Sequence, residues 1–181
     1  GDIESLPYIE SVRQLKWELG NKSLVIHLTL VPFLSASGEL KTKPTQHSVK
    51  QLLENGVQPD VLVLRTEHHI DENIRAKVAL FTNVAIEAVV QSIDVPSIYE
   101  VPLKMLEEKL DVTVLKKLDL PVTETTDLEA WNDFLYRLKN PGQSVDIALV
   151  GKYVELRDAY KSIAEALIHA ASQDKELGPD L

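Results

Sequence analysis

The sequence predicts an α/β fold in which a parallel sheet is flanked by helices. Three observations predict it. Short apolar, β-branched runs alternate along the chain with amphipathic segments of helical length. The runs are apolar at nearly every position, which is typical of strands buried on both faces. Several of the amphipathic segments begin or end at Ser, Pro, Asp, Asn or Gly, the residues that favour helix boundaries.

The first elements are expected between residues 5 and 56. A helix begins at Ser5, has Pro7 in its first turn and ends at Gly20. Residues 23–31 form a buried strand, and residues 32–42 form a loop. A second helix runs from Pro44 to the Asn-Gly pair at residues 55–56. The apolar sides of the two helices contain Ile9, Val12, Leu15 and Leu19, and Val49, Leu52 and Leu53.

The pattern repeats over the next part of the chain. Residues 61–64 form a short apolar strand, and Asp71 caps the following helix. The apolar side of that helix contains Ile74, Val78 and Leu80. Residues 88–92 form a weaker strand, and residues 99–118 are helical, in one piece or two. These elements define a first domain, residues 1–118.

The composition then changes. Residues 119–144 are expected to link two domains: a polar stretch, a helix over residues 127–138 and an Asn-Pro-Gly turn. The helix carries Trp131, Leu135 and Leu138 on one side. Residues 145–181 then resemble the start of a second domain, with a strand at 145–151 and a helix from Asp158. One such β-α unit is too small to bury a core alone, and the tail from residue 172 is polar.

Composition excludes several classes of protein. No apolar run approaches the roughly 18 residues of a membrane span, and the first residues lack a signal-peptide pattern. The absence of cysteine removes disulfides and thiolate chemistry. The net charge of −9 argues against a nucleic-acid surface. We therefore expect a soluble, cytoplasmic protein without nucleic-acid or membrane partners.

The strongest local signal for binding lies at residues 41–50. This decapeptide carries three lysines and no carboxylate within an acidic chain. Ammonium groups, threonine hydroxyls and the N–H groups of a helix N-terminus all favour a bound anion. A phosphate or nucleotide site is one interpretation. A solvated basic loop is the other, and spacing alone favours it.

Other polar residues give weaker signals. Asp2 and Glu4 could bind a metal or accept hydrogen bonds from a base or ribose, but Glu4 and Ser5 suit a helix N-terminus equally well. His27 is expected in the core, and His68 and His69 in a solvated loop rather than a metal site. No known catalytic or phosphate-loop motif is present.

Beyond these patterns, the chain resembles the CTP synthase family over nearly its whole length. The resemblance rests on eight blocks that occur in the family's order. They are Gly1-Asp-Ile-Glu-Ser-Leu-Pro7, His27-Leu-Thr-Leu-Val-Pro32, Lys41-Thr-Lys-Pro-Thr-Gln-His-Ser-Val-Lys50, Gln58-Pro-Asp60, Arg75-Ala-Lys77, Ile93-Asp-Val95, Ile98-Tyr99, and Val150-Gly-Lys-Tyr-Val-Glu-Leu156 with Asp158-Ala-Tyr160.

The resemblance implies a fold and an activity. The first domain would be part of a P-loop-type ligase (amidoligase) domain, and residues 145–181 the first β-α unit of a class I glutamine amidotransferase domain. The family converts UTP to CTP: ATP phosphorylates the uracil and ammonia from glutamine displaces the phosphate. GTP activates, CTP inhibits, and the active form is a homotetramer with nucleotide sites at subunit interfaces.

The resemblance also implies roles for single residues. The UTP and CTP phosphates would contact Lys41, Thr42, Lys43, Pro44, Thr45, Gln46 and Lys77. CTP would also contact Asp2, Ile3 and Glu4, and the adenine of ATP would contact Ile93, Asp94 and Val95. The Mg²⁺ ligands and the phosphate loop would precede Gly1, and the Cys-His-Glu glutaminase triad would follow residue 181. No catalytic residue or metal ligand is therefore expected within the chain.

Two alternatives remain. A ligase-like fold could serve as a non-catalytic module for oligomerisation, with the nucleotide site lost. An unrelated α/β domain with a phosphate-binding loop is the other possibility, if the matching blocks are fortuitous.

Overall fold

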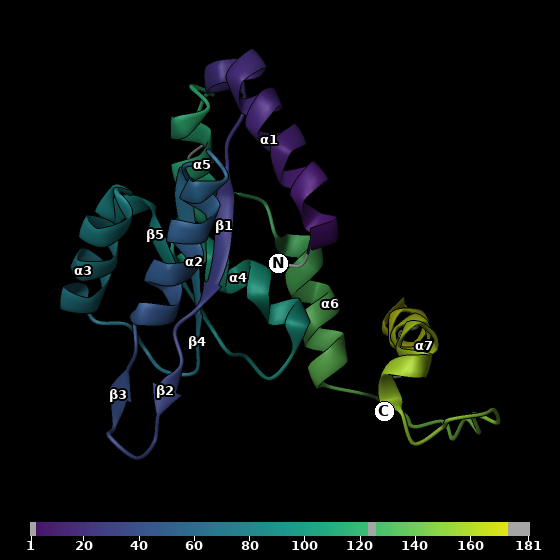
Figure 1. The fold of residues 1–181 in the computed structure, drawn as a ribbon. Coiled ribbons are helices and arrows are strands. Elements are labelled where there is room, and N and C mark those ends of the chain that lie inside the picture. Colours follow the sequence, from purple (N-terminus) through teal and green to yellow (C-terminus); the bar gives the residue numbers. More distant parts are fainter. Residues whose placement is uncertain (1–2, 123–125, 174–181) are drawn as a thin grey trace. The chain divides into compact units, whose positions relative to one another are not determined.

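Figure 1 shows a computed structural model of the chain, which describes residues 3–122 and 126–173. The chain divides into two compact units between these two ranges. The first unit contains a parallel sheet with helices on both faces, and the second contains two packed helices. No helix within the two ranges is both long and apolar enough to cross a bilayer.

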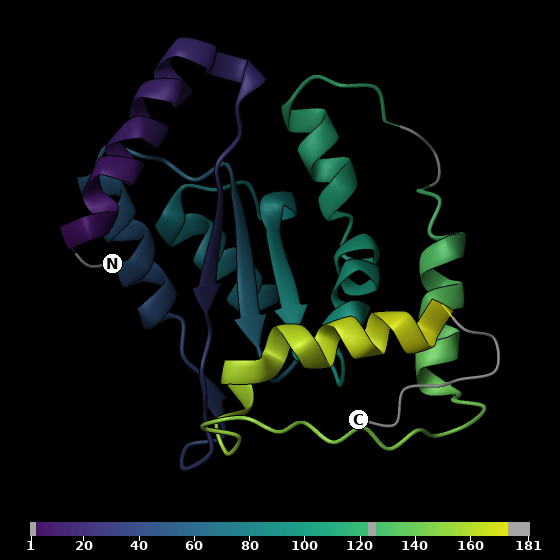
Figure 2. The same ribbon diagram turned by 90° about the vertical axis from the view of Figure 1, so that its right-hand side faces the viewer.

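The sheet contains three parallel strands in the order β1-β4-β5: β1 (Ile26–Leu30), β4 (Val61–Thr66) and β5 (Val89–Ile93). Their arrows point the same way in Figure 2. The predicted parallel sheet is confirmed. Central β4 is almost wholly apolar because both its faces are covered, and Val61, Leu62 and Leu64 are at most 1% exposed.

The prediction that residues 23–31 form a buried strand is wrong in part. The strand is shorter, and Ile26, Leu28 and Leu30 are 45%, 63% and 54% exposed. β1 lies at the edge of the sheet, and the intervening His27 and Thr29 contact α2 (Lys43–Glu54). The described residues therefore cover only one face of β1, and its apolar sequence does not reveal this.

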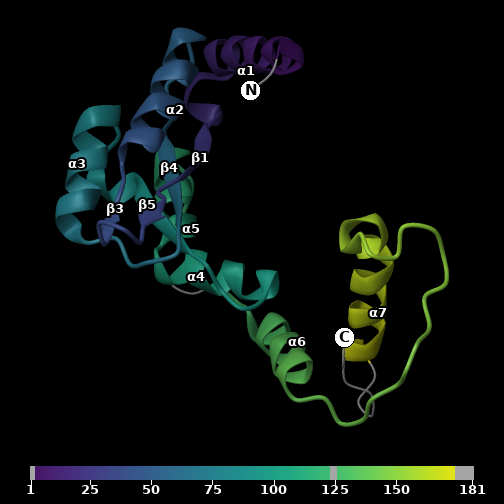
Figure 3. The same cartoon turned by 60° about the horizontal axis from the view of Figure 1, so that its bottom comes forward.

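Helices cover the two faces of the sheet. α2 packs with α3 (Glu72–Thr82) on one side, whereas α4 (Val101–Glu107) and α5 (Leu110–Lys117) lie on the other (Figures 1 and 3). The buried core joins strands and helices; it comprises Val31, Val49, Val61, Leu62, Leu64, Ile70, Val78, Ala79, Val84, Ala88, Val89 and Val90. A short 3-10 turn, η3 (Ile86–Ala88), leads into β5.

The predicted helix boundaries are largely confirmed. Asp71 caps α3, because its Oδ1 accepts from the Ile74 N–H at 2.7 Å. Gly56 follows α2 with φ of 77°, a left-handed conformation in which an added Cβ would lie 2.8 Å from the Arg13 side chain. Leu80 was expected inside but is 76% exposed. It lies about 200° around the helix from buried Val78.

The helical region at residues 99–118 has three pieces. A 3-10 turn, η4 (Ile98–Glu100), leads into α4, and Lys109 separates α4 from α5. Lys109 has φ of 58°, a left-handed conformation that cannot continue a helix. The chain therefore turns at Lys109.

The predicted loop at residues 32–42 contains a hairpin. Its strands, β2 (Phe33–Leu34) and β3 (Glu39–Leu40), pair antiparallel through a turn in which Gly38 has φ of 65°. Two-residue strands are too short to give an alternating pattern, so the sequence did not reveal them.

The predicted first helix is confirmed as α1 (Leu6–Leu19), which lies between the 3-10 turns η1 (Ile3–Ser5) and η2 (Gly20–Lys22). Its apolar side is largely open, because α1 has no buried residue and Val12, Leu15 and Leu19 are 42%, 50% and 46% exposed. The Lys16 ammonium joins α1 to the sheet: it donates to Asp60 Oδ2 at 2.7 Å and to the Ser23 carbonyl at 2.8 Å. α1 is attached here through polar contacts rather than through its apolar side.

The second unit contains α6 (Glu129–Lys139), η5 (Arg157–Tyr160) and α7 (Lys161–Gln173). The helices pack together: the Arg137 guanidinium donates to the Ser172 carbonyl at 2.9 Å, and the Phe134 and His169 rings lie 6.3 Å apart. Both helices were predicted. The boundaries at residues 118 and 144 remain predictions.

The strand expected at residues 145–151 is wrong. The segment is irregular, and its apolar residues Val145, Ile147, Leu149 and Val150 are 45–93% exposed. A strand needs a neighbour to satisfy its backbone, and the described part of the second unit contains none. Most of the polar tail predicted from residue 172 lies outside the described residues.

Candidate functional site

The candidate site lies at the carboxyl ends of the three parallel strands, and 'edge' here means this end of the sheet. β1 leads into the hairpin and the start of α2, β4 into residues 67–70, and β5 into residues 94–97. In open parallel sheets, ligands bind outside the carboxyl ends of the strands. Two segments singled out in the sequence, Lys41–Gln46 and Ile93–Val95, both follow strands at this edge.

The lysines of the first segment reach solvent. Lys41 follows the hairpin, and its N–H donates to the Pro32 carbonyl at 2.9 Å. Its ammonium lies 2.5 Å from Glu39 Oε2, and this hydrogen bond lowers the pKa of Glu39. Lys43 is exposed in the first turn of α2. Both side chains lie where a helix N-terminus favours an anion.

The threonines of this segment point inward. Thr45 is fully buried; its hydroxyl donates to the Leu30 carbonyl at 3.1 Å and lies 3.1 Å from Thr29 Oγ1. Buried Thr42 accepts from the Gln46 amide nitrogen at 3.3 Å. These contacts fix the start of α2 against the end of β1. A ligand would therefore meet Thr45 through its backbone.

The second segment is joined to β4. The Asp94 N–H donates to the Thr66 carbonyl at 2.9 Å, and Asp94 Oδ1 accepts from Arg65 Nε at 3.1 Å. Arg65 is an additional cation at this edge that the sequence reasoning missed. Its only signal was a charged residue near the end of an otherwise apolar strand.

The loop that carries His68 and His69 lies at the same edge, and both histidines are exposed, as expected. His68 and His69 line a cavity of about 460 Å³ together with Phe33, Glu39, Leu40 and Asp71. The His68 ring lies 4.0 Å from that of Phe33, and His69 Nδ1 lies 3.0 Å from the Gln91 amide nitrogen. Packing and hydrogen bonding therefore hold this solvent-exposed loop in place.

The other predicted residues that the structure describes belong to α3 and η1. Lys77 is exposed midway along α3, and no hydrogen bond or ion pair of the described chain joins it to Lys41–Gln46. Ile3 and Glu4 are exposed in η1. Asp2 lies outside the described residues.

His27 is half-buried rather than in the core. It lines a cavity of about 310 Å³ with Ser5, Ile9 and Ser48, and its Nε2 lies 2.9 Å from Ser48 Oγ. Burial lowers the pKa of His27 from its usual 6.5 because the charged ring loses solvation.

This shift predicts a pH dependence of stability. The unfolded chain binds the His27 proton more tightly, so the stabilisation is complete above the unfolded pKa and is lost as pH falls through the folded pKa. We expect the melting temperature to fall between neutral and mildly acidic pH, and less steeply after His27→Gln. Parallel melting curves for both proteins would contradict the assignment.

Among residues 3–122 and 126–173, no three His, Cys, Asp or Glu side chains are close enough to hold a metal ion. The cations of this region are Lys41, Lys43 and Arg65 beside the N-terminus of α2, and two of them are paired, Lys41 with Glu39 and Arg65 with Asp94.

The fold is an open parallel α/β sheet, a class of domain that commonly binds ligands at the carboxyl ends of its strands. Residues 1–120 match the family described as CTP synthase N-terminus. The chain is 66% identical over 176 residues to a CTP synthase of Flavobacterium johnsoniae, covering 97% of this chain and 33% of the relative. It is 66% identical over 172 residues to one of Bacteroides fragilis, covering 95% and 32%.

A CTP synthase of Porphyromonas gingivalis is 59% identical over 176 residues, covering 97% of this chain and 33% of the relative. The chain therefore belongs to the CTP synthase family. It spans about a third of the length of the curated relatives that it matches.

Proposed function

We propose that the chain is an internal part of a CTP synthase, the cytoplasmic ligase that aminates UTP to CTP with ATP and glutamine. Residues 1–118 would belong to the amidoligase domain, residues 119–144 to a linker, and residues 145–181 to the start of the glutaminase domain. The observation that carries the proposal is the 66% identity to a CTP synthase over 97% of the chain.

In this proposal, the segment Lys41–Gln46 binds the triphosphate of UTP or of inhibitory CTP. A triphosphate carries several negative charges and needs several donors at once. Lys41 and Lys43 offer ammonium groups, and Pro44 favours the helical start at which backbone N–H groups gather. The phosphate would compete with Glu39 for the Lys41 ammonium.

Lys77 would add a second cation, and Asp2, Ile3 and Glu4 would contact the base and ribose of CTP. Among the described residues, no hydrogen bond or ion pair joins Lys77 to the Lys41 segment, which is consistent with a site completed by a neighbouring subunit. A homotetramer would supply such neighbours. Ile93, Asp94 and Val95 would contact the adenine of ATP. Magnesium ligands are expected in the polypeptide before Gly1, and GTP would activate the glutaminase.

A comparison of activities tests the assignment. We expect the full-length protein to form CTP from UTP, ATP and glutamine, and the isolated 181-residue chain to form neither CTP nor glutamate. Turnover by the isolated chain would contradict the internal placement. A full-length protein that binds no nucleotide but self-associates would favour the non-catalytic module instead.

A further inference from the structure

β5 presents a free edge in the described part of the chain. It pairs with β4 on one side, and no described strand pairs with its other side. An edge strand exposes N–H and C=O groups that require other partners. The identity of those partners decides how firmly β5 is held.

Two side chains occupy this edge in place of a strand. Arg75 Nη1 donates to the Val89 carbonyl, and the Gln91 N–H donates to Glu108 Oε2 at 3.2 Å. Arg75 and Glu108 also pair with each other, with Nη1 and Oε2 3.1 Å apart. The Val89 carbonyl and the Gln91 N–H, two residues apart on β5, are therefore hydrogen-bonded to a cation and an anion that neutralise each other.

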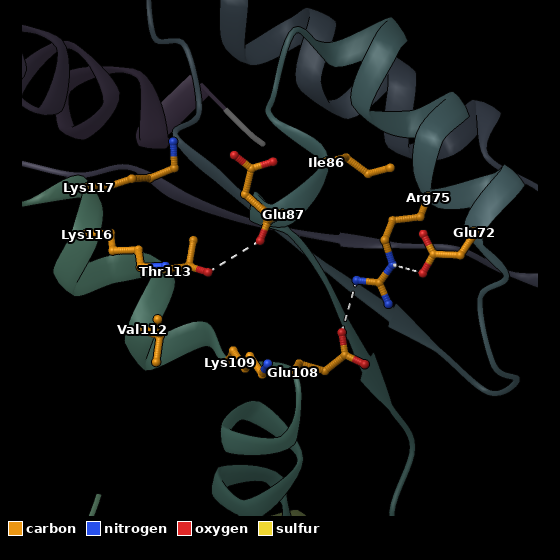
Figure 4. Close-up of a pocket in the computed structure, with 10 residues that line it drawn as sticks. All are labelled: Glu72, Arg75, Ile86, Glu87, Glu108, Lys109, Val112, Thr113, Lys116 and Lys117. Atoms are coloured by element: carbon orange, nitrogen blue, oxygen red, sulfur yellow. Dashed lines mark hydrogen bonds and ion pairs between the residues drawn. The ribbon is translucent and has the colours of Figure 1, made fainter. Parts of the chain in front are cut away.

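The pair joins three elements around a cavity of about 480 Å³ (Figure 4). Arg75 reaches β5 from α3, whereas Glu108 comes from the turn between α4 and α5. The two side chains are only 16% and 18% exposed, so solvent screens the pair less than it screens a surface ion pair. Its loss would leave buried polar groups without these partners.

The side chain of Gln91 is hydrogen-bonded as well. Its Oε1 accepts from the Ile70 N–H at 3.0 Å, and its Nε2 lies 3.0 Å from His69 Nδ1. Backbone and side chain of Gln91 thus connect the Arg75–Glu108 pair to the loop after β4. Ile93, the first residue of the proposed ATP segment, is only two residues further on.

We propose that Arg75 and Glu108 are positioning residues that hold β5 so that Ile93–Val95 keeps the geometry needed for ATP. This inference rests on the proposed ATP role of that segment. Neither side chain needs to touch the nucleotide. The pair fixes the backbone just before the segment, and displacements of about 1 Å at a binding segment can lower activity substantially.

The test uses the full-length protein. Glu108→Ala and Arg75→Lys are expected to raise the KM for ATP about tenfold, leaving the KM for UTP and kcat within about twofold. Hydrogen exchange in residues 89–95 should accelerate. Glu108→Gln keeps an acceptor oxygen and should retain most of the wild-type affinity for ATP.

A neighbouring carboxylate provides the matched control. Glu107 pairs with Lys104 at 2.8 Å on the surface of α4, and none of its hydrogen bonds or ion pairs reaches β5. Glu107→Ala should change neither KM nor the exchange of β5. Equal increases in both KM values with a lower melting temperature would show a merely structural role and overturn the proposal.

A second experiment distinguishes the ATP role of residues 93–95 from the positioning role of Arg75 and Glu108. Added ATP should slow hydrogen exchange at residues 93–95 of the wild-type protein. If it does not, the proposed ATP role fails, and the positioning role fails with it. If ATP does protect the segment but Glu108→Ala changes neither exchange nor the KM for ATP, the positioning role alone is overturned.

Discussion

Replacing Lys41 with Ala in the full-length protein is expected to raise the UTP requirement about 10- to 100-fold. A hydrogen bond to a charged group contributes about 1.5–3 kcal/mol, and each 1.4 kcal/mol is about a tenfold change in affinity. CTP inhibition should weaken by a similar factor, because both nucleotides would place phosphates against the same ammonium. Steady-state kinetics with UTP varied, with and without CTP, measure both effects.

Three variants control for this result. Lys22→Ala removes an exposed lysine of η2, just after α1, and should change neither the UTP requirement nor the inhibition by CTP. Glu39→Gln removes the competing carboxylate and should lower the UTP requirement. Lys77→Ala, like Lys41→Ala, should raise the UTP requirement and weaken the inhibition by CTP. Unchanged kinetics for both Lys41→Ala and Lys77→Ala would contradict the assigned phosphate site.

Much of the fold could be predicted because local sequence patterns, such as apolar runs and helix caps, indicate its elements. β4 was found from an uninterrupted apolar run, and α3 from its Asp71 cap. The errors about burial share one cause, because burial depends on neighbours that a local pattern does not identify. Apolar β1 is open on one face, and residues 145–151 are apolar but lie in no described sheet.

The sequence could indicate the candidate site only where its residues are contiguous. Lys41–Gln46 stands out through its composition, but its inward-facing Thr45 could not be distinguished from a ligand residue without the structure. Arg65 approaches Asp94 only because β4 lies beside β5. The pairing of Arg75 with Glu108 likewise joins α3 to the turn between α4 and α5, so the sequence pattern gave no indication of it.

Thr45→Val is expected to lower the free energy of unfolding by about 1–3 kcal/mol, although valine has nearly the same shape and is more apolar. The substitution removes a donor to the Leu30 carbonyl and a partner of the Thr29 hydroxyl, and the site is too buried for water to replace them. Urea unfolding followed by far-ultraviolet circular dichroism measures the change.

Thr45→Ser is the matched control, because it keeps the hydroxyl and loses one methyl group, at a cost of about 0.8 kcal/mol. If apolar burial dominated at this position, valine would be the better tolerated residue. The opposite order is expected, because Thr45 connects the first turn of α2 to the end of β1 through its hydroxyl. The same contact positions Lys41 and Lys43, so Thr45→Val should also raise the UTP requirement, whereas a more stable valine variant would contradict this role for the hydroxyl.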